Sequence, residues 1–214
     1  SEVITDWEKV DKTVWKVRIP NEFFGDFNPY KTKIEGDWLM SPRGEVHLGD
    51  VYINGVSMYE AHSYDDLCRA EKREIWEQND WRYKTEFVLN PENTVYQWYA
   101  QVDDENTTIW CNFQEIDPNT VTIEINVRQS CFYPSRAGIN YITLRGFEIA
   151  QAACPFTPPT SDQIGMVGGH WSKGWIIENN RLHDGKCSAI SIGKDGATGD
   201  NLSSRFGRKS GHRY

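Results

Sequence analysis

The chain has 214 residues, of which 38% are hydrophobic and 13% aromatic, which is typical of an ordered protein with one sizeable core or two small ones. Its formal net charge of −8 argues against nucleic acid or an anionic membrane as the main partner. No apolar run approaches the roughly 20 residues that span a bilayer, and the start, SEVITDWEKV, does not read as a signal peptide.

The first 125 or so residues contain short segments in which apolar and polar residues alternate. Alternation of this kind predicts β-strands, and Asn54-Gly55 between two apolar runs predicts a tight hairpin. Several such strands separated by turn residues predict an antiparallel β-sandwich. The predicted strands lie within TVWKVRIP (13–20), DVYINGVSMY (50–59), TVYQWYAQVD (94–103), TTIWCNF (107–113) and TVTIEINV (120–127).

One helix is expected among these strands. Ser63, with Asp66 three residues later, resembles a capping pair, and the segment YDDLCRAEKREIWEQ (64–78) has few β-branched residues. Leu67, Ala70 and Ile75 would face the core.

The pattern changes near residue 126, which sets a predicted domain boundary at about residue 125. From there, Gly, Asn and Ser interrupt short apolar segments, and a proline-containing loop runs from about 152 to 172. The loop is longer than a plain connection needs.

A repeat of 33 residues relates YITLRGFEI (141–149) to GWIIENNRL (174–182). Both segments contain two short apolar stretches with a break between them, at Gly146 in the first and Asn179 in the second. Repeated pairs of short strands with a sharp bend are typical of successive coils of a parallel β-helix. The aligned apolar positions are Ile142 with Trp175, Leu144 with Ile177, and Ile149 with Leu182, while Phe147 aligns with Asn180.

Charged residues support the same alignment. Arg145 falls beside Glu178, and Glu148 falls beside Arg181. Adjacent coils lie about 4.8 Å apart, so we expect two exposed salt bridges, each contributing at most about 1 kcal/mol. A retaining glycosidase needs two carboxyl groups about 5 to 5.5 Å apart, and in this register no carboxylate lies beside another.

Four long segments resemble the β-xylosidases of glycoside hydrolase family 120. They are NEFFGDFNPYKTKIEGDWLM, HLGDVYINGVSMYE, CFYPSRAGINYITLRGFEIAQAA and WSKGWIIENNRLHDGKCSAISIG. The resemblance covers residues 1–214 and is weakest over about 65–94. It implies an all-β chain in which a β-sandwich insertion, residues 1–125, is followed by part of a right-handed parallel β-helix, residues 126–214.

The family removes xylose from the non-reducing ends of xylo-oligosaccharides with retention of configuration. The resemblance implies that the catalytic nucleophile and the acid/base lie on later coils, beyond Tyr214. We therefore expect a fragment that is inactive alone, and we assign no catalytic residue within it. No cofactor is expected.

Four residues are candidates for binding the xylo-oligosaccharide. The resemblance suggests that Trp38 forms a sugar-stacking surface, although a tryptophan in the sandwich core is an equal alternative. Asp162, His170 and Trp171 give the long loop hydrogen-bonding and stacking groups; the alternative is a surface loop packed by its prolines.

The remaining histidines and the cysteines point to structural roles. His183 and Asp184 have the chemistry of a catalytic dyad, but neighbours in a strand point to opposite faces, so a turn pair is the preferred interpretation. His47 and His62 have no metal-ligand partner at a useful spacing, and five scattered cysteines without a C-x-x-C motif argue against a zinc site. Their odd number slightly favours a reducing compartment such as the cytoplasm.

Two other functions are compatible with parts of the sequence pattern. A non-catalytic carbohydrate-binding or assembly module would use the sandwich and its tryptophans directly. A polysaccharide lyase on the same fold would need an acidic calcium cluster, which the sequence does not suggest. The inserted sandwich beside a coil end also offers a surface on which a homo-oligomer could form.

Overall fold

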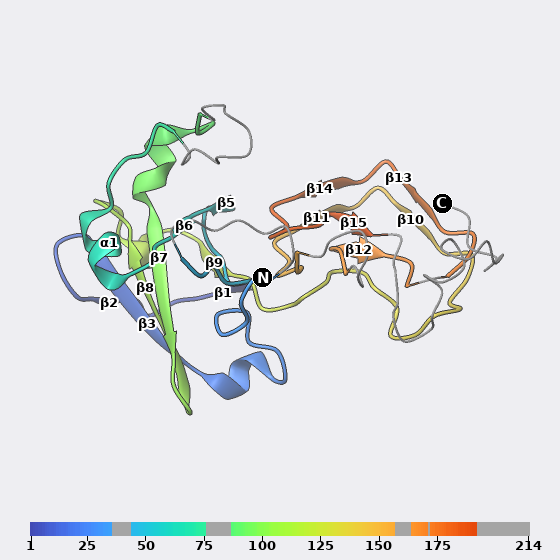
Figure 1. The fold of residues 1–214 in the computed structure, drawn as a ribbon, viewed down its shortest axis with the longest axis horizontal. Coiled ribbons are helices and arrows are strands. Elements are labelled where there is room, and N and C mark those ends of the chain that lie inside the picture. Colours follow the sequence, from blue (N-terminus) through green and yellow to red (C-terminus); the bar gives the residue numbers. More distant parts are fainter. Residues whose placement is uncertain (36–43, 76–86, 157–163, 171, 192–214) are drawn as a thin grey trace. The chain divides into compact units, whose positions relative to one another are not determined.

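The computed structural model describes residues 1–35, 44–75, 87–156, 164–170 and 172–191. The chain divides into two compact units. The sandwich unit comprises residues 2–33 and 40–125, and the coil unit comprises residue 1, residues 34–39 and residues 126–214 (Figure 1). Within the described residues, no helix combines the length and apolar character needed to cross a membrane.

The sandwich unit contains two β-sheets. The four-stranded sheet is antiparallel, with the order β1 (Glu2–Val3), β9 (Ile123–Ile125), β4 (Val51–Ile53), β5 (Val56–Ser57). The five-stranded sheet has the order β2 (Glu8–Lys9), β3 (Val14–Pro20), β8 (Asn106–Asn112), β7 (Gln97–Val102), β6 (Tyr59–Glu60). Strands β6 and β7 run parallel, so the predicted antiparallel arrangement has this one exception among the pairs of this unit. The exception arises because the chain passes from β5 in one sheet to β6 in the other through Met58 alone.

The core of this unit is filled by alternate residues of the strands, as the sequence pattern predicts. Ile109, Trp98 and Ile123 are almost completely buried. Tyr30 lies between the sheets: its ring contacts that of Trp98 at 5.4 Å, and its hydroxyl donates a hydrogen bond of 2.6 Å to the carbonyl oxygen of Asp50. Burial, reinforced by nearby acidic groups, raises the pKa of the Tyr30 hydroxyl.

The hairpin between β4 and β5 confirms the prediction made from Asn54-Gly55. Both residues have positive φ, 50° for Asn54 and 81° for Gly55, as a type I′ turn requires. The pairing of Ile53 with Val56 then fixes the register of the two strands.

The helix is shorter than its sequence suggests. Helix α1 spans Tyr64–Arg69 and begins as predicted, because the Ser63 hydroxyl accepts a hydrogen bond from the Asp66 amide. It ends at Ala70, whose φ of 44° is left-handed. The predicted continuation is wrong for residues 70–75, and Ile75 is 49% exposed rather than in the core; the rest of that prediction lies outside the described residues. The left-handed Ala70 closes the helix, because its amide donates a hydrogen bond of 2.8 Å to the Asp66 carbonyl, and the charged run Glu71–Glu74 follows.

The described part of the sandwich unit also contains three short 3-10 helices. They are η1 (Asn21–Phe24), η2 (Pro91–Val95) and η3 (Pro118–Thr120).

The described part of the coil unit contains three parallel pairs of short strands. The pairs are β10 (Thr143–Arg145) with β13 (Ile176–Glu178), β11 (Glu148–Ala150) with β14 (Arg181–His183), and β12 (Val167–Gly168) with β15 (Ile190–Ser191). Leu144 pairs with Ile177 and Ile149 pairs with Leu182, which confirms the predicted register of 33 residues.

These pairs surround one apolar core. Leu144, Ile149, Met166 and Val167 are buried there, and Leu182 packs against them. Three parallel pairs around a shared core are the arrangement that two stacked coils produce. A complete β-helix and its handedness remain predictions.

The bends between strands lie where the repeat predicts them. Gly146 has φ of 76° and Asn179 has φ of 54°, so equivalent corners of the two coils use the left-handed conformation. Asn180 then joins the coils: its amide nitrogen donates to the Leu144 carbonyl at 2.9 Å, and its amide oxygen accepts from the Phe147 amide at 3.0 Å.

Candidate functional site

The sequence prediction named four sugar-binding candidates, of which the structure describes His170. Trp38, Asp162 and Trp171 lie outside the described residues. His170 follows strand β12 by two residues and has a left-handed backbone, with φ of 44°. A histidine in this conformation is uncommon, and such residues are found preferentially at functional sites and tight turns.

Two contacts hold the His170 ring in place. Its Nδ1 lies 2.9 Å from the carbonyl oxygen of Pro134, and its ring stacks on Tyr133 with a centroid distance of 5.1 Å. A carbonyl oxygen only accepts hydrogen bonds, so Nδ1 carries the proton. In the neutral ring, Nε2 is then the acceptor nitrogen.

A second aromatic pair, Phe132 and Trp175, lies in the same unit. Trp175 donates from Nε1 to the Ile139 carbonyl at 2.6 Å, and its ring contacts Phe132 edge-on at 5.8 Å. Phe132 pairs with Val167, which brings the 131–134 segment next to the strand that leads to His170. The contacts of His170 with Tyr133 and of Phe132 with Trp175 were not predicted, because they follow no simple spacing in the sequence.

Tyr133 and His170 together offer groups that can bind and orient a ligand. Aromatic faces suit the apolar face of a pyranose ring, and a fixed imidazole suits a hydroxyl group. Neither group is a nucleophile for glycoside cleavage, which uses a pair of carboxylic acids.

The two predicted salt bridges between the coils are confirmed. Arg145 lies 2.8 Å from Glu178, and Arg181 lies 2.9 Å from Glu148. All four side chains are more than 40% exposed, so these pairs support the register of the coils and contribute little stability.

His183 extends this charged cluster. Its Nδ1 lies 2.5 Å from Asp184 and its Nε2 lies 3.0 Å from Glu148. Strand β14 ends at His183, and Asp184 follows it with φ of 50°, so the Asp184 side chain turns back toward His183 and the two form a pair just after the strand, as the preferred interpretation expects. The hydrogen bond to Asp184, and then that to Glu148, raises the pKa of His183.

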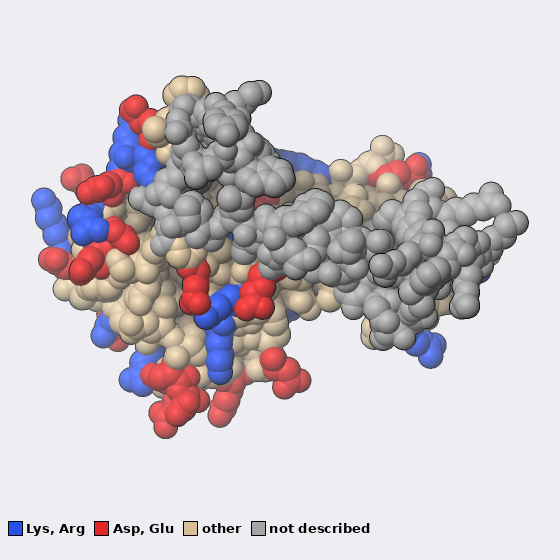
Figure 2. Space-filling view, in the orientation of Figure 1, with Lys and Arg blue, Asp and Glu red and all other residues tan. Residues whose placement is uncertain are grey.

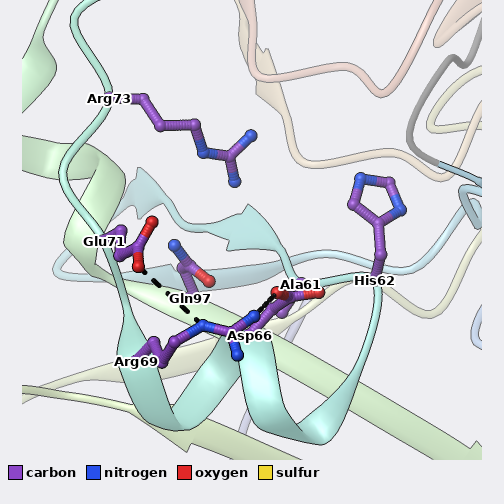
Figure 3. A pocket seen from close by; sticks show the side chains of 7 residues that line it. All are labelled: Ala61, His62, Asp66, Arg69, Glu71, Arg73 and Gln97. Carbon is purple, nitrogen blue, oxygen red and sulfur yellow. Dashed lines mark hydrogen bonds and ion pairs between the residues drawn. The ribbon is translucent and has the colours of Figure 1, made fainter.

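A shallow pocket on the sandwich unit offers a second place to look for function (Figure 3). Arg69 forms ion pairs there with Asp66 and, at 3.9 Å, with Glu71. Within the described residues, the buried Nδ1 of His62 has no hydrogen-bond partner. The pocket lining balances two arginines with two acids and contains no aromatic platform, so it favours neither an anion nor a sugar. Its residues are Ala61, His62, Asp66, Arg69, Glu71, Arg73 and Gln97.

Groups of three or more His, Cys, Asp or Glu side chains with metal-site geometry do not occur in the part of the chain that the structure describes. The five cysteines are all free thiols.

Comparison with known proteins gives two matches. Residues 4–125 match the family described as "Glycoside hydrolase 120, insertion domain". A solved structure titled "The complex structure of XylC with xylose" is 53% identical to this chain, with a TM-score of 0.88, and the match covers 98% of this chain and 33% of XylC. No curated protein matches. The chain thus spans about one third of XylC, and it belongs to glycoside hydrolase family 120, with residues 4–125 as the insertion domain.

Proposed function

We propose that the full-length protein that contains this chain is a retaining β-xylosidase, which releases xylose from the non-reducing ends of xylo-oligosaccharides. The main support is the 53% identity to XylC, whose structure was solved with xylose, over 98% of this chain. In this proposal the two catalytic carboxyl groups belong to the part of the protein outside this chain.

The proposal gives each unit a role. The sandwich, residues 1–125, is the insertion, and residues 126–214 are the first coils of a right-handed parallel β-helix. A β-helix suits a retaining mechanism, because strands on neighbouring coils lie about 4.8 Å apart, close to the 5 to 5.5 Å that separate the two carboxyl groups.

The described acids of the coil unit fit structural roles better than catalytic ones. Glu148 is shared between Arg181 and His183, and Glu178 is paired with Arg145. A nucleophile held by two cations in water would have little tendency to attack a sugar carbon.

We further propose that His170 binds a hydroxyl group of the substrate, and that Trp38, Asp162 and Trp171 contribute to the same sugar-binding surface. The support for His170 is its fixed tautomer, its left-handed backbone and the Tyr133 ring stacked on it.

The activity is tested by incubating the full-length protein with 4-nitrophenyl β-xyloside and with xylotriose. Release of nitrophenol and of xylose is expected. If the intact, folded protein releases neither, the proposed function is wrong.

The role of His170 is tested on xylotriose with His170→Ala and with His170→Gln, which keeps hydrogen-bonding capacity. We expect His170→Ala to raise KM at least fivefold with kcat within twofold of wild type, which is the pattern of lost substrate binding. The KM of His170→Gln should lie between those of wild type and His170→Ala. Tyr141→Ala, which removes an aromatic ring that is 79% exposed in the same unit, is the matched control. Equal KM values for all three variants would contradict the assignment.

A further inference from the structure

The outer face of the five-stranded sheet carries ordered rows of side chains that its covering helix leaves uncovered. Helix α1 lies on the side of this sheet opposite to the four-stranded sheet (Figure 1). It covers the row that contains Val14 and Asn112: Leu67 packs against Val14, and Asn112 donates from Nδ2 to the Leu67 carbonyl at 2.9 Å. Rows further along the strands extend beyond the helix.

The first row beyond the helix is aromatic. Cross-strand pairing places Lys16, Trp110 and Tyr99 side by side on β3, β8 and β7. The ring of Trp110 lies 6.1 Å from that of Tyr99 and 5.9 Å from that of Tyr64, the first residue of α1. Trp110 and Tyr99 pack in part on the core beneath α1, yet both keep part of their surface in solvent.

The next row is polar. Arg18, Thr108 and Gln101 are paired across the same three strands. Because residues two apart in a strand are about 6.8 Å apart, this row runs alongside the aromatic one. Gln101 donates to the hydroxyl of Tyr99 at 3.1 Å, which links the two rows. We call the two rows together the aromatic face.

The charges on the aromatic face cancel. Lys16 pairs with Glu8 at 3.2 Å, and Arg18 pairs with Asp103 at 3.9 Å. Elsewhere on the sandwich unit, Figure 2 shows acidic and basic side chains close to one another. A face with paired charges complements an uncharged ligand better than a nucleic acid or a strongly acidic peptide.

We propose that the aromatic face is a binding site for a linear, uncharged chain of β-linked pyranoses. The apolar faces of successive sugar rings would lie on Trp110 and Tyr99, with Tyr64 at the edge. Arg18, Thr108 and Gln101 would then hydrogen-bond the hydroxyl groups along one edge of the glycan. The choice of xylan as the glycan rests on the proposed function. The arrangement of the aromatic and polar rows itself indicates only the class of ligand, a linear, uncharged glycan.

The chemistry of the face distinguishes this ligand from a protein partner. A stable contact between two protein surfaces buries about 800 Å² on each side and has an apolar centre. Here a row of charged and hydrogen-bonding side chains lies directly beside a few aromatic rings, which matches the alternation of apolar faces and hydroxyl edges on a glycan.

The test uses the full-length protein in affinity electrophoresis through gels that contain soluble, neutral xylan. Chain ends are rare in such a polymer, so retardation reports binding along the chain. Wild type is expected to be retarded. Trp110→Ala should weaken the apparent affinity at least fivefold, since an aromatic contact of about 1 kcal/mol corresponds to that factor. Gln101→Ala, at an exposed position where misfolding is not a concern, should weaken it about twofold.

Phe23→Ala is the matched control, because Phe23 is an exposed aromatic residue of the same unit, at 47% exposure, and belongs to η1 rather than to the two rows of the aromatic face. It should be retarded like wild type, and all three variants should hydrolyse 4-nitrophenyl β-xyloside at the wild-type rate. Absence of retardation in an active wild-type protein overturns the aromatic-face proposal and leaves the xylosidase proposal intact. Equal retardation of Trp110→Ala, Gln101→Ala and wild type also overturns it. So does sedimentation that shows wild type as a dimer and Trp110→Ala as a monomer, because the face would then be a contact between two copies of the protein.

Discussion

Asn180 offers the sharpest test of how the two coils are held together. Its side-chain amide bridges them with two hydrogen bonds, from Nδ2 to the Leu144 carbonyl at 2.9 Å and from the Phe147 amide to Oδ1 at 3.0 Å. The replacement Asn180→Ala removes both bonds, whereas Asn180→Asp keeps the acceptor and loses the donor.

The expected cost follows from these two bonds. A typical hydrogen bond contributes about 0.5 to 1.5 kcal/mol, so Asn180→Ala should destabilise the coil unit by about 1 to 3 kcal/mol. The lower half of this range is expected, because the site is only partly buried and water can replace the lost partner. Asn180→Asp should cost about half as much.

Hydrogen exchange gives the most local readout, because the Phe147 amide is itself one of the donors. We expect Asn180→Ala to speed exchange at Phe147 by tenfold or more, and Asn180→Asp to keep most of the protection there. Asn179→Gly is the control, since Asn179 has φ of 54° and glycine adopts that conformation freely. Unchanged exchange at Phe147 in Asn180→Ala would refute the bridging role.

Three further predictions concern single side chains. Tyr30→Phe keeps the buried ring but loses the 2.6 Å hydrogen bond to Asp50, and should lower the free energy of unfolding of the sandwich unit by about 1 to 2 kcal/mol in urea titration; an unchanged midpoint would contradict this. The raised pKa of His183 means that protonated His183 stabilises the folded state. This contribution to the free energy of unfolding is fully present below about pH 6.5 and is lost as the pH rises through the raised pKa. The wild-type Tm should therefore exceed that of His183→Gln near pH 5.5 and equal it at pH 9. A Tm difference that does not change with pH would exclude stabilisation by protonated His183. Iodoacetamide should alkylate exposed Cys68 quickly and Cys111 only on unfolding, because burial raises the pKa of the Cys111 thiol; early labelling of Cys111 in mass spectra would argue against its burial.

Local patterns predicted the parts of the fold that local chemistry determines. Alternation marked β3, β7 and β8, because a strand with one buried face must alternate, and Asn54-Gly55 marked its hairpin, because a type I′ turn needs two residues with positive φ. The register of 33 could be found because stacked coils align apolar with apolar and acid with base, as in the pairing of Arg145 with Glu178.

Features that depend on tertiary contacts or on one backbone angle could not be predicted. Helix α1 ends at Ala70, although the sequence beyond contains good helix formers, because Ala70 adopts a left-handed conformation that its residue type does not signal. The hydrogen bond between His183 and Asp184 depends on a single left-handed residue. The contacts of His170 with Tyr133 and of Trp175 with Phe132 join segments whose approach no sequence spacing reveals.

The stereochemistry of cleavage tests the central proposal most directly. Proton NMR of the full-length protein acting on xylotriose, recorded in the first minutes before mutarotation, distinguishes the two anomers of the released xylose. A retaining mechanism predicts that β-xylose appears first and that the α-anomer grows in later. Initial release of α-xylose, or no release of xylose, would contradict the assignment of this protein as a retaining β-xylosidase.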